Sequence, residues 1–99
     1  MFLGDTNKKI FGNEEILRYN TIMIECTYLY EKEEKLALRN NHICWTDLKP
    51  FVLSHPDQFF VLFHFSLKYK NEEILNFFEL ESLKHKITNI KPWVLTYTI

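Results

Sequence analysis

The sequence predicts an α/β fold in which short strands are covered by helices, and three observations lead to this. Two apolar stretches rich in β-branched and aromatic residues, at 21–25 and 58–66, are typical of buried strands. Segments of helix-forming composition lie between and after these strands, as in layered α/β domains. The 99 residues contain no internal repeat and no linker-like segment, so 1–99 is expected to form a single domain.

The first expected elements are short. Met-Phe-Leu at 1–3 predicts the tip of a buried strand, and a short helix is expected near Asn13 to Arg18. The stretch from Thr21 to Glu25 is apolar and β-branched until its last residue, which predicts a strand buried on both faces. The segment EKEEKLALRNN at 31–41 is a strong helix former, with its charges mainly in its first half.

A second helix is expected directly afterwards, within WTDLKPFVLSHP. Thr46 is the expected N-cap, and Pro50 falls early enough for the first turn. The helix is expected to end before His55-Pro56. The segment QFFVLFHFS at 58–66 then predicts another strand buried on both faces.

The strongest helix prediction covers NEEILNFFELESLKHK at 71–86. Asn71 is the expected cap, acidic residues lie in the first turn, and lysines near the end suit the helix dipole. The apolar stripe that we expect to pack in the core consists of Ile74, Leu75, Phe77, Phe78 and Leu80. The tail NIKPWVLTYTI at 89–99 is expected to form a terminal strand or an extended arm.

Composition excludes several classes of function. The 12 basic and 13 acidic residues give a net charge of −1, so the chain as a whole exerts no general attraction on nucleic acid. The longest apolar run, Phe59 to Leu67, is too short to span a membrane. Cys26 and Cys44 do not form a C-x-x-C pair, and we expect two free thiols in a reducing, cytoplasmic location.

Candidate functional residues lie at the carboxyl ends of the expected strands, where α/β sheets hold their ligands. Asp5 follows the first strand tip, Glu25 ends the second strand, and His64 lies near the end of the third. His42 lies on the loop between the two central helices. The pattern predicts that Asp5 is a ligand or a catalytic carboxylate at a strand tip.

Four short motifs follow one another along the chain: GDT at 4–6, IECTYL at 24–29, NNH at 40–42 and VLFHFSLKY at 61–69. Their order and rough spacing resemble the C-terminal half of the metallo-β-lactamase-fold hydrolases. The likeness is greatest to the tRNase Z (ribonuclease Z) branch, which removes 3′ trailers from tRNA precursors by phosphodiester hydrolysis. The resemblance extends from Met1 to about Phe78. It implies the C-terminal half of an αββα sandwich, a partial domain whose short strands are covered by helices on one face.

The resemblance also implies roles for the residues at the strand ends. Asp5 would bridge two metal ions, usually zinc, and His64 would bind the second ion. Glu25 and His42 would form a catalytic pair that protonates the leaving oxygen. In the family a histidine precedes this glutamate, whereas the present chain has Ile24 there.

Two further residues, Ser66 and Lys68, correspond to family positions near the scissile phosphate. The family tends to have arginine where Lys68 stands, and lysine offers a point charge in place of a bidentate guanidinium. Two metal ions would activate water and stabilise the charge that develops on the phosphodiester. The substrate that the resemblance implies is precursor tRNA.

The main metal-binding motif of the family, His-x-His-x-Asp-His, does not occur in this sequence. In the family that motif lies in the N-terminal half of the domain. Because Asp5 and His64 are too few ligands for a dinuclear site, we expect the isolated chain to be inactive and not to hold catalytic zinc tightly. The missing ligands are expected from an N-terminal half on another chain or from a homologous subunit. A half sandwich on its own is expected to dimerise or self-associate.

Simpler interpretations remain for each candidate. Asp5 can be a turn residue, Glu25 a helix-capping acid, His42 a surface-loop residue and His64 a hydrogen-bonded core histidine. The remaining histidines, His55 and His85, are expected to be solvated. For the chain as a whole, the alternatives are a non-catalytic interaction module derived from the same fold and an unrelated small α/β domain.

Overall fold

The computed structural model describes residues 2–3 and 18–94. Its elements are β1 (Phe2–Leu3), β2 (Thr21–Glu25), the 3₁₀ helix η3 (Glu31–Glu33), α1 (Glu34–Arg39), α2 (Trp45–Ser54), β3 (Phe59–Phe63), α3 (Asn71–His85) and β4 (Ile90–Pro92). Strands and helices alternate as predicted, which confirms a compact α/β domain. Asp5, and all but the last residue of the helix expected near Asn13 to Arg18, lie outside the described residues.

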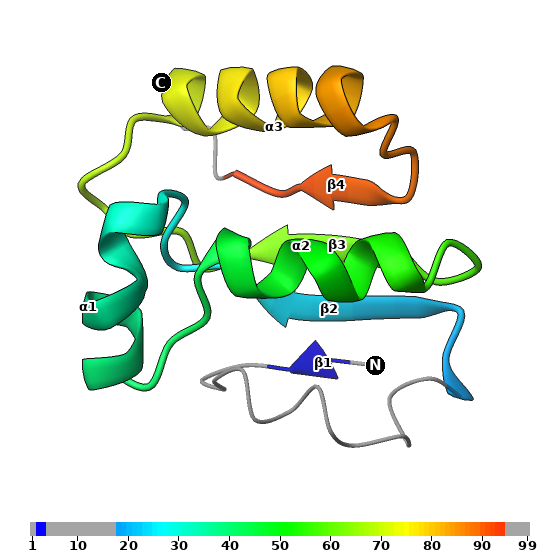
Figure 1. Cartoon of the computed structure of the whole chain (residues 1–99), viewed down its shortest axis with the longest axis horizontal. Coiled ribbons are helices and arrows are strands. Elements are labelled where there is room, and N and C mark those ends of the chain that lie inside the picture. The colour runs from blue at the N-terminus through cyan, green and yellow to red at the C-terminus, as the bar shows by residue number, and fades with distance from the viewer. Residues whose placement is uncertain (1, 4–17, 95–99) are drawn as a thin grey trace, which may run out of the picture.

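The strands of the described part form one sheet in the order β1-β2-β3-β4, and neighbouring strands are parallel throughout. In this register Ile24 of β2 lies between Leu3 of β1 and Leu62 of β3. The carboxyl ends of the strands therefore meet at one edge of the sheet. This is the left-hand edge in Figure 1, beyond which α1 lies.

One face of the sheet, here called the inner face, carries the hydrophobic core. Its central residues are fully buried: Ile22 and Ile24 of β2 and Phe60 and Leu62 of β3. Helix α2 lies in front of β2 and β3 in Figure 1, with its axis along the strands. The same core includes Trp45, Leu48 and Val52 from α2 and Ile74 and Phe78 from α3. The Trp45 and Phe78 rings meet edge to face at 5.0 Å between centroids, so the two helices also pack against each other.

The opposite face, here called the outer face, is only partly covered. Because side chains alternate along a strand, Met23 of β2 and Val61 and Phe63 of β3 extend to this face. All three are half-buried, and Phe59 is 38% exposed. The prediction that both strands are buried on both faces is therefore wrong for the outer face. The strands are apolar on both faces, but the described helices place their core residues against only one of them.

Helix α2 begins two residues earlier than predicted. Cys44 is its N-cap residue and Trp45 its first helical residue, so Thr46 is not the N-cap. Burial of the large Trp45 side chain fixes this start more strongly than a capping hydroxyl would. The Thr46 hydroxyl instead donates to Glu34 Oε1 at 2.6 Å and ties α2 to α1. Pro50 lies in the second turn rather than the first, where proline removes one helical hydrogen bond.

Helix α3 differs from its prediction in two details. Lys70 is the N-cap residue and Asn71 is already helical. The apolar stripe is narrower than expected, because Leu75 and Leu80 are 44% and 67% exposed. Only side chains three or four residues apart share a helical face, and these two leucines lie away from the line through the core residues of this helix.

The tail residues at 90–92 form β4, so the terminal-strand interpretation holds for that segment. As the last strand in the order, β4 is an edge strand, where Pro92 is tolerated. The backbone N–H of Trp93 donates to the Leu62 carbonyl at 2.7 Å and extends the pairing.

Both cysteines are free, as predicted, and both are buried. Burial raises the pKa of the Cys26 thiol well above its ordinary value and also raises that of Cys44. Neither thiol is therefore activated as a nucleophile or a metal ligand. Each helix of the described part is too short or too polar to cross a membrane.

Candidate functional site

Three of the predicted site residues meet at the carboxyl edge of the sheet. Glu25 is the last residue of β2, His64 directly follows β3, and His42 lies on the loop between α1 and α2. One ligand atom from each lies within 4.8 Å of the others. We call these three residues the Glu-His-His group. Asp5, the fourth residue predicted for this edge, lies outside the described residues.

Backbone hydrogen bonds hold the three segments of the Glu-His-His group together. The Cys26 N–H donates to the Phe63 carbonyl at 2.8 Å, which continues the pairing of β2 with β3. The Thr27 N–H donates to the Ile43 carbonyl at 3.0 Å, and the Thr27 carbonyl accepts from the Ser66 N–H at 2.9 Å. The segment after β2 therefore lies between the loop that carries His42 and the loop that begins at His64.

The end of α1 sets the position of His42. Asn41 has φ 57°, a left-handed conformation that asparagine tolerates better than most residues and that ends the helix. The His42 N–H then donates to the Ala37 carbonyl at 2.9 Å. The side chain of His42 is 25% exposed and directed toward Glu25. The NNH motif is thus a helix terminator followed at once by the site histidine.

Glu25 is fully buried, and its two carboxylate oxygens differ in their partners. Oε2 accepts from the Thr27 hydroxyl at 2.5 Å and lies 2.9 Å from His42 Nδ1 and 3.7 Å from His64 Nδ1. Oε1 is buried and has no hydrogen-bond partner among the residues that the structure describes. A buried carboxylate oxygen without a partner is costly, so this atom marks a place where a cation or donor belongs.

His64 is not the core histidine of the simpler interpretation, because its side chain is half exposed. Its backbone has φ 62°, the left-handed region, which is uncommon for a residue other than glycine. Its Nδ1 lies 3.3 Å from the Thr27 hydroxyl, and its ring centroid is 5.5 Å from that of His42. The strained backbone conformation directs this imidazole toward Glu25.

Ser66 and Lys68, the two residues predicted near a phosphate, lie on the loop after β3. Lys68 is engaged within the domain, because its ammonium forms an ion pair with Glu33 Oε2. The ammonium also lies over the Tyr28 and Tyr69 rings, at 5.3 and 5.5 Å from their centroids. The Ser66 hydroxyl oxygen accepts from the Lys68 N–H at 3.4 Å.

The sequence interpretation missed Glu33, which lies in a charge run that looks solvated but is only 5% exposed. Its Oε1 accepts from the Tyr69 hydroxyl and from the Tyr30 N–H. Burial alone would raise the pKa of Glu33, but hydrogen bonds from Lys68, Tyr69 and the Tyr30 backbone together hold this pKa below its ordinary value. The third position of a helix is where a capping glutamate is common, and that spacing from Tyr30 was the available signal.

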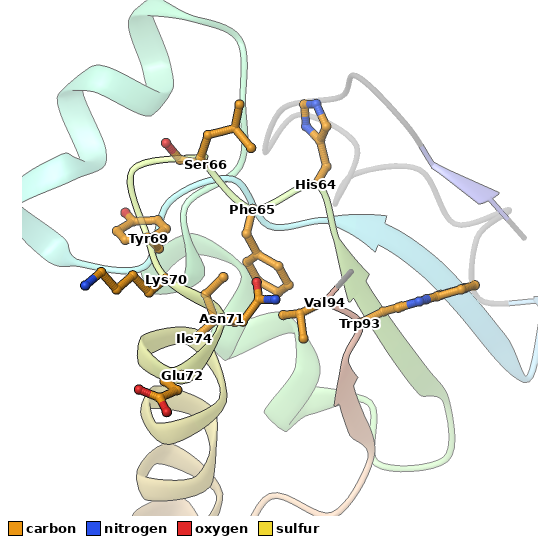
Figure 2. Close-up of a pocket in the computed structure, with 11 residues that line it drawn as sticks. His64, Phe65, Ser66, Tyr69, Lys70, Asn71, Glu72, Ile74, Trp93 and Val94 are labelled. Atoms are coloured by element: carbon orange, nitrogen blue, oxygen red, sulfur yellow. The ribbon is translucent and has the colours of Figure 1, made fainter. Parts of the chain in front are cut away.

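A cleft of about 670 Å³ adjoins the site at His64. It lies between the loop after β3, the first turn of α3 and the residues that follow β4 (Figure 2). Trp93, which is 54% exposed, forms one wall. The other residues that line the cleft include Phe65, Ser66, Tyr69, Asn71 and Ile74. The cleft therefore offers an aromatic surface with a few polar groups beside the Glu-His-His group.

The other two histidines lie outside the Glu-His-His group and are half-buried rather than fully solvated. His55 Nδ1 lies 2.8 Å from the Phe51 carbonyl oxygen, to which it donates when protonated. His85 Nε2 lies 3.8 Å from Glu81 Oε2 and 3.5 Å from the Lys49 ammonium.

Two imidazoles and a carboxylate in this arrangement can do two kinds of chemistry. They can hold a divalent metal ion, since imidazole and carboxylate are both zinc ligands. They can also transfer a proton, since a carboxylate that accepts from one imidazole nitrogen fixes the tautomer of the ring.

Comparison with protein-family models and with curated proteins finds no match for this chain.

Proposed function

We propose that this chain is the C-terminal half of a metal-dependent phosphodiesterase of the tRNase Z type, inactive alone and completed by a second polypeptide segment. The observation that carries the proposal is the contact of His42 Nδ1 with the buried Glu25, 2.9 Å from Oε2, beside His64. These are the residues to which the resemblance assigns the catalytic pair and one metal ligand. Their convergence at the carboxyl edge of a parallel sheet supports that assignment.

In the proposed enzyme, Glu25 orients His42. When His42 Nδ1 donates to Glu25, its Nε2 is the nitrogen that can deliver a proton to the leaving oxygen of a phosphodiester. The nearby carboxylate stabilises the imidazolium that carries this proton. Asp5 and His64 would contribute to a zinc site whose remaining ligands come from the second segment, and the bound metal would supply an activated water and charge stabilisation.

Precursor tRNA is the proposed substrate, with Ser66 and Lys68 near the scissile phosphate. Lys68 would then exchange its partner, because its ammonium cannot serve Glu33 and a phosphate fully at the same time. A side chain that is 47% exposed has room for this movement. Phosphate binding by Lys68 would therefore be weaker than binding by an uncommitted arginine at the same position.

The half-buried outer face is an argument for a second polypeptide segment. In the αββα sandwich that the resemblance implies, a second sheet would pack against this face, which carries Met23, Val61 and Phe63. A separate N-terminal half or a homologous subunit would both supply such a sheet. Without a second sheet, we expect two copies of the chain to associate through the same face. The cytoplasmic location stays a prediction.

The test is reconstitution. The chain is mixed with a separately produced N-terminal half of a tRNase Z-type enzyme that carries the His-x-His-x-Asp-His motif, together with zinc and precursor tRNA. We expect cleavage of the 3′ trailer by the mixture and by neither half alone. His42→Ala should abolish cleavage but leave association intact, while His55→Ala, outside the site, should change neither. A mixture that neither associates nor cleaves contradicts the proposal.

One observation favours a second candidate, a non-catalytic interaction module of the same ancestry. The Lys68 ammonium, predicted to bind phosphate, is committed to the buried Glu33. Under this alternative the outer face binds a homologous chain, and the Glu-His-His group is dispensable. Association that survives Glu25→Gln and His42→Ala, with no cleavage by any mixture, would favour it over the enzyme.

A further inference from the structure

The Glu-His-His group has an incomplete set of interactions that the proton-transfer role does not explain. Glu25 is fully buried, yet its Oε1 has no hydrogen-bond partner among residues 2–3 and 18–94. Both histidines direct Nδ1 toward the same carboxylate. A catalytic pair with Glu25 needs only one imidazole. Two imidazoles around one buried carboxylate are the arrangement of a metal site.

We infer that the isolated chain binds one zinc ion through Glu25, His42 and His64. This inference goes beyond the proposed function, because it concerns the chain without a second polypeptide, in which His42 Nδ1 binds the ion instead of donating to Glu25. It also assigns the ion to a ligand set without Asp5. It also differs from the sequence-based expectation that the lone chain holds no catalytic zinc tightly. The site would be mononuclear, and the fourth coordination position of the ion would be open to water.

The two distances from the carboxylate to the imidazole nitrogens are close to those that zinc needs, and all three ligand atoms lie within 4.8 Å of one another. Ligand atoms at about 2.0–2.1 Å from a tetrahedral ion lie about 3.3 Å from one another. Here Glu25 Oε2 lies 2.9 Å from His42 Nδ1 and 3.7 Å from His64 Nδ1, on either side of that value. Small side-chain rotations would therefore open room for the ion. Glu25 Oε1 could replace Oε2 as the ligand and gain the partner that it lacks.

The chemistry of the ligand atoms selects the class of metal. Two imidazole nitrogens and one carboxylate favour zinc or a similar transition metal over magnesium and calcium, which prefer oxygen ligands throughout. The Thr27 hydroxyl, 2.5 Å from Glu25 Oε2, would keep the carboxylate oriented once it binds the ion. The exposed sides of His42 and His64 leave a route from solvent.

The group is held by the fold rather than by mobile side chains alone. Backbone hydrogen bonds of Cys26 and Thr27 fix the segment after β2 against both histidine loops. The left-handed conformation of His64, at φ 62°, is maintained at an energetic cost. Both features reduce the reorganisation that zinc binding would need.

A second Glu-His contact in the described chain provides an internal control. His85 Nε2 lies 3.8 Å from Glu81 Oε2, a separation similar to that of His64 and Glu25. The Lys49 ammonium, however, is 3.4 Å from Glu81 Oε1 and 3.5 Å from His85 Nε2. Its positive charge already occupies the place of a cation, so this pair should not bind zinc.

The experiment is zinc titration of the purified full chain, with any affinity tag removed and no second polypeptide present. We expect one zinc ion per chain. Affinity should fall by about tenfold or more in each of Glu25→Gln, His42→Gln and His64→Gln. The matched control His85→Gln should leave it unchanged. Cobalt in place of zinc should give the intense visible spectrum of a four-coordinate site in the wild type and lose it in Glu25→Gln.

Asp5→Asn separates this ligand set from the family's. Unchanged zinc affinity in Asp5→Asn supports the three-residue site, whereas a loss as large as that of His64→Gln overturns it. Absence of stoichiometric binding, or equal binding by Glu25→Gln, also overturns it. Circular dichroism of each variant in chelator shows whether the fold is retained, and zinc-dependent protection against heat provides a second measure. Failure here leaves the proposed reconstitution standing, and failed reconstitution with intact zinc binding rejects only the enzyme.

Discussion

Two buried carboxylates in this domain are held in different ways. Both oxygens of Glu33 have partners: the Tyr69 hydroxyl and the Tyr30 N–H at Oε1, and the Lys68 ammonium at Oε2. Glu25 is buried more completely, but its neighbours all lie at Oε2, and Oε1 has none in the described part of the chain. The first arrangement is complete within the domain, and the second is not.

This difference separates a structural role from a functional one. A buried charge whose oxygens are all paired stabilises the fold and needs nothing further. A buried charge with an unpaired oxygen persists at a cost, and such groups are typical of sites that bind a ligand. Glu33 therefore joins η3 to the loop after β3, while Glu25 is the residue for which we propose a bound cation or a substrate.

The largest effect on stability is expected from Glu33→Ala. The buried Tyr69 hydroxyl would lose its acceptor and the Lys68 ammonium its partner, so the free energy of unfolding should fall by about 2–3 kcal/mol. Urea denaturation measures this loss. Glu31→Ala, at an exposed position of the same 3₁₀ helix, is the matched control and should change stability by less than about 0.5 kcal/mol. Equal losses in the two variants would contradict a structural role for Glu33.

Acid should weaken the domain through the same residue. Burial opposes ionisation of Glu33, yet hydrogen bonds from Lys68 and Tyr69 bring its pKa below the ordinary value of a glutamate. A carboxyl whose pKa is lower in the folded state stabilises the fold above its unfolded pKa, and this contribution is lost as pH falls through the folded value. Urea titrations between pH 7 and pH 3 should show stability falling at the acid end. Glu33→Gln should flatten that fall, and an unchanged slope would refute the assignment.

The same two carboxylates show what could be predicted from the sequence. The strand of Glu25, the loop of His42 and the end of the strand at His64 all follow from apolar runs and their polar ends, so their convergence was predictable. Glu33 was not, because a charge run such as EKEEK indicates a solvated helix, and its burial depends on Tyr69, 36 residues away. Local patterns do not encode which charge a distant loop will cover.

Other departures have similar causes. Thr46 is a good N-cap by residue type, but burial of Trp45 starts α2 earlier. The runs of β2 and β3 are apolar on both faces, yet the described helices cover one face only. In the first case tertiary packing overrides a local preference. In the second, the sequence predicts a buried outer face, whereas the described residues leave that face half-buried, which agrees with the proposed second sheet.

Glu25→Gln should affect stability much less than the Glu33 variants. Measured in chelator, this variant should change the free energy of unfolding by less than about 1 kcal/mol, because the amide oxygen can still accept from the Thr27 hydroxyl while a buried charge is removed. Urea denaturation beside Glu33→Gln is the measurement. A loss at Glu25 as large as that at Glu33 would mean that Glu25 serves the fold in the same way.

The smallest effects are expected at two left-handed residues, His64 at φ 62° and Lys86 at φ 54°. Lys86 ends α3 in the conformation that glycine prefers, so Lys86→Gly should stabilise the domain by about 0.5–1 kcal/mol. Lys84→Gly, inside the same helix, should destabilise it by about 1 kcal/mol and serves as the control.

At His64, relief of the backbone strain is offset by loss of the contact between its Nδ1 and the Thr27 hydroxyl. We therefore expect His64→Gly to gain less than Lys86→Gly, about 0.5 kcal/mol or below, in the absence of zinc. Thermal denaturation with and without zinc measures the stability of both variants. Zinc should stabilise Lys86→Gly but not His64→Gly. A marked loss of stability in metal-free His64→Gly would show that this imidazole supports the fold, and its strained backbone would then need no functional explanation.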